Sequence, residues 1–158
     1  MNRRRRKKLT PRLVFAASQG ETATVRSLLR SGLLHPELPD ADGTTALYAA
    51  SVHGAADTVR VLLRAGALPD TESLGVTEGT PLCAAAAWGH VDTVRELLAH
   101  GADPNLREDL GTGRTPLRWA RDGAGGPHPE TEAALLAAGA TEDAAGATGN
   151  AAAAPRAV

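Results

Sequence analysis

Apolar residues recur at helical spacing along the chain. One stretch places Val25, Leu28 and Leu29 at positions i, i+3 and i+4, and the same spacing returns twice more, as Val59, Leu62 and Leu63 and then as Val94, Leu97 and Leu98. Such spacing forms one apolar stripe along an amphipathic helix. Together with a fourth, weaker copy, the pattern predicts short helices within residues 21–32, 55–67, 91–105 and 129–140.

A second helix is predicted before each of these. The segments are TPRLVFAASQG (10–20), GTTALYAASVHG (43–54), GTPLCAAAAWGH (79–90) and GRTPLRWARDG (113–123). Thr45, Thr80 and Thr115 are 35 residues apart, and the last two precede a proline. Thr is a favourable N-cap and Pro is suited to the first helical position. Glycines at 32, 66, 101 and 139 can close the second helices. The chain therefore reads as a repeated two-helix unit.

This unit resembles the ankyrin repeat. The resemblance is carried by Thr80-Pro81-Leu82, by Gly89-His90 and by the Leu97–Asn105 segment LLAHGADPN. It implies an all-α, ankyrin-type helical solenoid of four helix-turn-helix repeats with short, hairpin-like finger loops. We expect the repeats at about 10–40, 41–75, 76–110 and 111–141, within a domain spanning residues 10–141.

Departures from the family pattern lie in the connections. The stretches LPDTESLGV (68–76) and NLREDLGTG (105–113) are longer than is usual for the family, whose fingers they would form. The family histidine that ties helix to finger is replaced by Tyr48, Cys83 and Arg118, so the fingers are expected to be less uniform. We expect Tyr48 to bond within its own repeat. Glu132 replaces an apolar stripe residue, which is typical of a terminal, capping repeat.

Charge separates the ends from the body. The chain has 158 residues and a net charge of −1, but a basic run opens it (Arg3, Arg4, Arg5, Arg6, Lys7 and Lys8), which leaves the remainder at −7. We expect residues 1–9 to be a disordered basic arm and the Ala/Gly-rich residues 142–158 a disordered tail. The abundance of Arg over Lys suggests a high-GC bacterial source. No apolar run is long enough to span a bilayer, and we expect a cytoplasmic protein.

Signals for chemistry are weak. A single cysteine excludes an intrachain disulfide, and no histidine pair has metal-ligand spacing on one helix, so we expect no metal and no cofactor. Cys83 has no activating base in sequence and is expected to be a small buried apolar residue. The glycine-rich stretches lack a phosphate-loop continuation. We therefore expect no enzymatic activity.

The resemblance implies a monomeric protein-binding module, acting as adaptor, scaffold or inhibitor through its concave groove and finger loops. Candidate contact residues, at helix ends that the family motif leaves exposed or in the fingers, are Gln19, Val52, His53, Ala87, Trp88, Asp122, Asp42, Thr44, Leu74, Val76, Thr77 and Arg114. Trp88 is the preferred anchor, with packing against Val52 and His53 as its alternative. Finger acids (Asp70, Glu72, Glu78, Glu108, Asp109) either are simply solvated or steer a basic partner. The alternative function is a nucleic-acid-associated regulator that uses the basic arm.

Overall fold

The structure, a computed structural model, describes residues 3–75 and 78–142, with side chains from residue 9 onward. Eight of its helices form four successive pairs: α1 (Arg3–Ser18) with α2 (Thr22–Arg30), α3 (Ala46–Val52) with α4 (Ala56–Arg64), α5 (Pro81–Ala87) with α6 (Val91–Ala99), and α8 (Pro116–Asp122) with α9 (Pro129–Ala137). Between the pairs lie the strands β1 (Ser73–Leu74) and β2 (Glu78–Gly79) and the short helical turn α7 (Glu108–Gly111).

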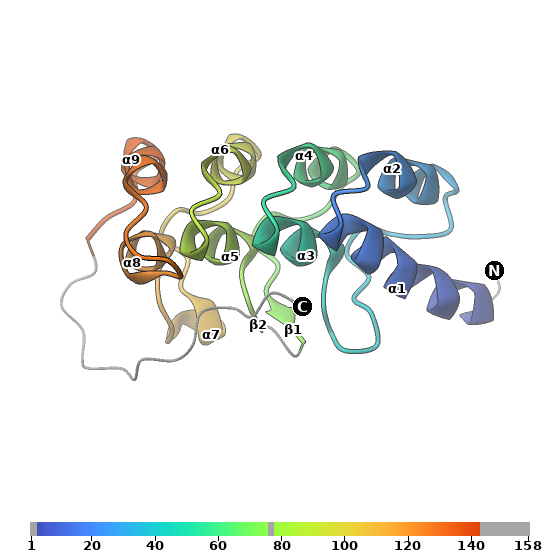
Figure 1. Cartoon of the computed structure of the whole chain (residues 1–158). Helices are drawn as coiled ribbons and strands as arrows, with labels where there is room; N and C mark the ends of the chain where they lie inside the picture. Colours follow the sequence, from blue (N-terminus) through green and yellow to red (C-terminus); the bar gives the residue numbers. More distant parts are fainter. Residues whose placement is uncertain (1–2, 76–77, 143–158) are drawn as a thin grey trace.

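The helix pairs stack side by side into a two-layered solenoid (Figure 1). The inner helices α1, α3, α5 and α8 contact one another in that order, and the outer helices α2, α4, α6 and α9 form a parallel row above them. In the described part of the chain, the main contacts of each pair are therefore with its neighbours, as expected for a repeat protein. The predicted all-α solenoid is confirmed.

Threonine caps fix the start of three inner helices. The hydroxyl oxygens of Thr45, Thr80 and Thr115 each accept a hydrogen bond from the backbone N–H three residues later, at 3.2 Å. Pro81 and Pro116 occupy the first helical position, where a missing N–H costs nothing. These caps are those that the sequence predicts.

The outer helices bury the predicted stripe. Val25, Val59 and Val94 are fully buried. A threonine column runs beside them: the hydroxyls of Thr58 in α4 and Thr22 in α2 lie 2.8 Å apart. One unit further, the buried hydroxyl of Thr93 has no hydrogen-bond partner. Counted from the turn glycines, the residue of α4 equivalent to Thr22 is Ala56. Because alanine has no hydroxyl, Thr93 lacks the partner that Thr58 has, which explains the unpaired hydroxyl.

The first helix differs from the prediction. Helix α1 begins at Arg3, so the described part of the expected disordered arm is helical, and Thr10-Pro11 lies inside the helix rather than at its start. Arg and Lys are good helix formers, and no glycine separates them from the apolar turn that follows. In Figure 1 the start of α1 extends beyond the row of inner helices. The basic side chains of residues 3–8 lie outside the described part of the chain.

Three finger loops project from the inner row on the side away from the outer helices (Figure 1). We call them finger 1 (residues 38–44), finger 2 (70–79, of which 76–77 are not described) and finger 3 (103–114). The pairing of β1 with β2 makes finger 2 a hairpin, whereas finger 3 holds the turn α7. The expected irregularity of the fingers is thus confirmed. The Tyr48 hydroxyl donates to the Glu78 carbonyl in finger 2 at 3.0 Å, so it reaches the following repeat. A bond within its own repeat stays a prediction.

The C-terminal pair is held by ion pairs. Arg121 in α8 contacts the Glu132 carboxylate in α9 at 2.7 Å, and it also pairs with Glu142. The charge of Glu132 is therefore paired within the α8–α9 pair. Residues 143–158, most of the predicted tail, lie outside the described residues.

Candidate functional site

Two of the predicted contact residues are buried. Val52, at the end of α3, is 6% exposed, and Ala87, at the end of α5, is 0% exposed. Val52 packs with Ala84 and Trp88 of the following unit, and Ala87 belongs to the main core. The turn histidine of the following unit also reaches back to each helix end: His90 Nε2 lies 3.0 Å from the Val52 carbonyl, and His128 Nε2 lies 3.2 Å from that of Ala87. The prediction that these two side chains are exposed is wrong.

Trp88 lies in the seam between α3 and α5. Its ring is half-buried and packs against Tyr48, Val52 and Ala84. The indole N–H is buried and has no hydrogen-bond partner, an arrangement that costs about 1–3 kcal/mol. Packing against Val52, the alternative considered for Trp88, is confirmed, and its role as a binding anchor stays a prediction.

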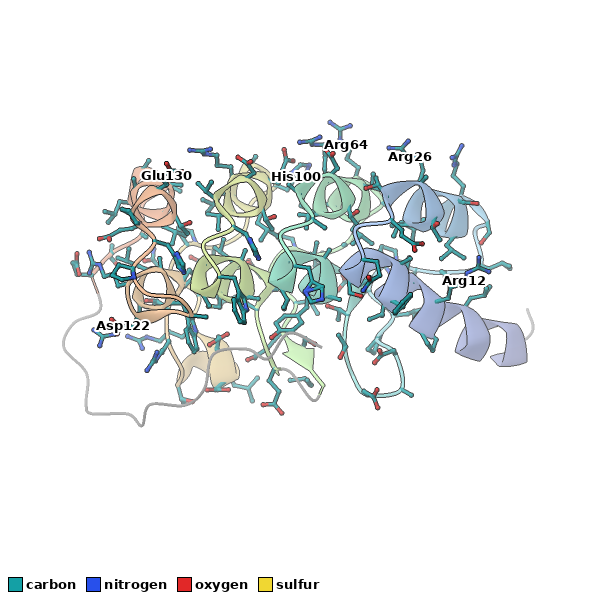
Figure 2. All side chains as sticks on the ribbon, viewed as in Figure 1. Arg12, Arg26, Arg64, His100, Asp122 and Glu130 are labelled. Carbon is teal, nitrogen blue, oxygen red and sulfur yellow. The ribbon has the colours of Figure 1, made fainter. Side chains whose placement is uncertain are left out.

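The remaining candidates divide by exposure. Leu74 is 69% exposed, and Gln19 and Asp42 are also exposed, whereas His53 and Thr44 are half-buried. The structure does not describe Val76 and Thr77. Asp122 is exposed at the end of α8 (Figure 2) and pairs with Arg118 at 2.5 Å. Arg114 is half-buried, with its guanidinium 4.7 Å above the ring of Trp119.

Finger 3 contains a buried acid that the sequence analysis placed among solvated or steering groups. Glu108 is 7% exposed, and its Oε2 accepts a hydrogen bond from Trp119 Nε1 at 2.5 Å. Its Oε1 lies against the α-carbon of Gly79 in finger 2, where any β-carbon would collide with it. The carboxyl group therefore packs between two fingers and an inner helix. Gly79, whose φ is +128°, makes the space for it.

Burial governs the acid–base properties of this cluster. Desolvation raises the pKa of Glu108 from 4.5 to about 7, although the Trp119 N–H partly offsets the effect. Desolvation also raises the pKa of the Cys83 thiol well above its ordinary value, and the Glu108 charge adds to this. The Cys83 side chain is fully buried, as expected. A thiol with a raised pKa and no access to solvent is poorly suited to nucleophilic chemistry.

The tip of finger 3 has an unusual backbone. Asp109 and Leu110 have φ values of 52° and 54°, in the left-handed region that costs a leucine about 1–2 kcal/mol. The Glu72 carboxylate of finger 2 accepts hydrogen bonds from their N–H groups, at 2.6 Å from Asp109 and 3.4 Å from Leu110. Leu110 is nevertheless 90% exposed. The sequence analysis missed this residue because nothing in the letters EDLG signals a left-handed turn.

Other polar side chains join successive connecting loops. Asp70 accepts a hydrogen bond from the Asp103 N–H at 3.0 Å, and Asn105 Oδ1 accepts one from the Thr141 N–H at 2.8 Å. The Glu37 carboxylate accepts bonds from the following loop in the same way. Asp70 and Glu72 thus have internal partners. Of the predicted acidic rim, Glu78 and Asp109 are exposed.

A polar crevice of about 540 Å³ lies between the first turns of α2, α4 and α6. Arg60 on its wall contacts Asp57 at 2.8 Å and Glu96 at 2.6 Å. Its guanidinium is therefore already neutralised by the protein's own acids. In the described part of the chain, no cluster of three His, Cys, Asp or Glu side chains could hold a metal ion. No helix there is both long and apolar enough to cross a bilayer.

Stacked helix pairs with projecting fingers define a helical repeat solenoid, and comparison with known families identifies its repeats. The model for three ankyrin repeats matches residues 1–73, and that for a single ankyrin repeat matches residues 79–109. The chain contains ankyrin repeats and has an ankyrin-type fold. Ankyrin repeats are generally protein–protein interaction modules and are typically non-catalytic. The α8–α9 pair lies beyond both matches. No curated protein shows significant similarity to the chain.

Proposed function

We propose that the chain is a non-catalytic adaptor, scaffold or inhibitor that binds another protein through its inner helices and fingers. The observation that carries this proposal is that three of the five exposed large apolar side chains among the described residues lie on an inner helix or a finger, whereas Leu68 and Leu136 lie elsewhere. Phe15 on α1 is 63% exposed, and Leu74 and Leu110 on the fingers are 69% and 90% exposed. These side chains do not serve the core, and exposed apolar groups on a common side are typical of interaction surfaces.

Register supports placing Phe15 on the finger side. Counted back from the turn glycine at the end of each inner helix, Phe15 is equivalent to Ala49 and Ala84. Counted forward from the capping threonines, Ala49 and Ala84 are in turn equivalent to Trp119. Trp119 reaches finger 3 through its bond to Glu108. The two aromatic residues thus lie at either end of the inner row, with the buried Ala49 and Ala84 at the same register between them.

Photo-cross-linking tests the proposal. A photoreactive phenylalanine analogue is placed at Phe15 or Leu74, and at the control position Arg64, which points away from the inner row on α4 (Figure 2). After irradiation in native cell extract, discrete protein adducts are expected from Phe15 and Leu74 but not from Arg64. Adducts from Arg64 alone, or equal adducts from all three positions, would contradict the proposed binding face.

A further inference from the structure

Two adjacent fingertips present the same combination of side chains. In finger 2, Leu74 pairs directly with Glu78 across the β1–β2 hairpin. Opposite residues of an antiparallel pair lie on the same face, and both of these are exposed. In finger 3, exposed Leu110 follows exposed Asp109. Each fingertip therefore offers one aliphatic group beside one carboxylate.

The two fingertips are joined into one surface. Glu72, two residues before Leu74, accepts the hydrogen bonds from the Asp109 and Leu110 N–H groups at 2.6 and 3.4 Å. The link holds Leu110 on a defined backbone while its side chain stays in solvent. We call the four residues Leu74, Glu78, Asp109 and Leu110 the fingertip surface.

The exposed charges on the described parts of the fingers are all negative. The charged residues of the described fingers that are exposed are Asp42, Glu78, Asp103 and Asp109. The two arginines of finger 3 are half-buried and engaged, since Arg107 donates to the Gly113 carbonyl at 2.9 Å and Arg114 stacks on Trp119. A partner approaching the fingertips therefore meets carboxylates and aliphatic groups, without a competing exposed cation.

We infer that the fingertip surface binds a protein segment in which Lys or Arg side chains lie beside apolar ones. The apolar groups would cover Leu74 and Leu110, and the basic groups would pair with Glu78 and Asp109. Such pairing sets orientation and speeds association, whereas burial of the leucines supplies most of the affinity. This inference rests on the proposed function and names the chemical class of the partner.

Selection from a random peptide-display library against the immobilised chain tests the inference. Enriched peptides are expected to combine Lys or Arg with aliphatic or aromatic residues. Their binding should weaken about tenfold in Leu74→Ser and in Leu110→Ser, as expected for loss of an apolar contact, and also in Glu78→Lys. Matched controls on α9, Leu136→Ser and Glu130→Lys, should leave binding within about twofold of the wild type. Circular dichroism of each variant verifies that the fold is retained.

The outcomes separate this inference from the proposed function. Peptides without basic enrichment that lose binding in Phe15→Ser but not in the leucine variants would overturn the inference and leave the proposed function standing. Loss of binding in the α9 controls to the same degree would also overturn it. Sedimentation of the free chain adds one further outcome: if a dimer forms and Leu110→Ser dissolves it, a second copy occupies the surface and the inference is wrong. If neither selection nor cross-linking at Phe15 gives a product, the proposed function fails as well.

Discussion

Replacing Glu108 with glutamine is expected to stabilise the protein in a pH-dependent manner. Glutamine keeps a carbonyl oxygen for the Trp119 N–H but cannot ionise. The difference between an ordinary pKa of 4.5 and about 7 in the folded protein corresponds to about 3 kcal/mol, at about 1.4 kcal/mol per pKa unit. That free energy is the largest gain that removing the ionisation of Glu108 can produce.

The sign follows from proton binding. Below pH 4.5 the Glu108 carboxyl is neutral in the folded and the unfolded chain, so its ionisation does not affect stability. Between pH 4.5 and about 7 the unfolded chain loses this proton first, and the free energy of unfolding of the wild type falls as pH rises. Above about pH 7 both states are ionised and the loss is complete. Glu108→Gln should therefore exceed the wild type by under about 1 kcal/mol at pH 5 and by about 3 kcal/mol at pH 8.

Urea denaturation followed by far-UV circular dichroism at pH 5, 6, 7 and 8 measures this difference. Glu78→Gln is the matched control, because Glu78 is an exposed acid on the neighbouring finger. Its difference from the wild type should not grow with pH. A constant offset between Glu108→Gln and the wild type would refute the reasoning, since it would mean that folding does not raise the pKa of Glu108. A variant less stable than the wild type at pH 8 would show that the bond to Trp119 requires a charged acceptor.

Three further expectations can be measured on purified protein. Ala56→Thr should raise the free energy of unfolding by about 1 kcal/mol, because it gives the buried Thr93 hydroxyl a partner. Ala23→Thr, on the exposed side of α2, is the control for helix propensity. An equal effect of the two substitutions would contradict the pairing of the introduced hydroxyl with that of Thr93. Leu110→Gly should also stabilise by about 1 kcal/mol by relieving the left-handed backbone, and a lower urea midpoint would argue against strain there. Cys83 should react with an aromatic disulfide reagent only after urea unfolding, and rapid labelling of the native protein would contradict its burial.

The sequence predicts the parts of the fold that depend on local patterns. The helix caps at Thr80 and Thr115 are predictable because a capping bond spans only three residues. Val59 is buried because helical spacing places it on the stripe that faces the core. Such features need no knowledge of distant segments. The start of α1 was mispredicted for the opposite reason: the charge pattern suggested repulsion, whereas the helix propensity of Arg and Lys favoured a helix.

The candidate site is less predictable because it depends on contacts between repeats. Val52 occupies a position that the family register treats as exposed, but the turn of the next unit covers it. Glu108 is one of several acids in a finger. Its burial requires Trp119 in the following helix and a glycine at position 79, 29 residues earlier in the chain. No local signal separates it from Asp109, which is exposed.

These contacts bear directly on the binding proposed for the fingers. A long loop that orders only on association loses conformational freedom at that moment, at about 0.5–1.5 kcal/mol for each immobilised side chain. In this protein the Glu72 carboxylate of finger 2 already holds the backbone at the tip of finger 3. Glu108 also fixes finger 3 against Trp119 of α8. The acids Asp70, Glu72 and Glu108 thus hold the loops in place, which leaves Glu78 and Asp109 for the proposed electrostatic contacts with a partner. Because these contacts are present before association, the described parts of fingers 2 and 3 would need less ordering when the proposed partner binds.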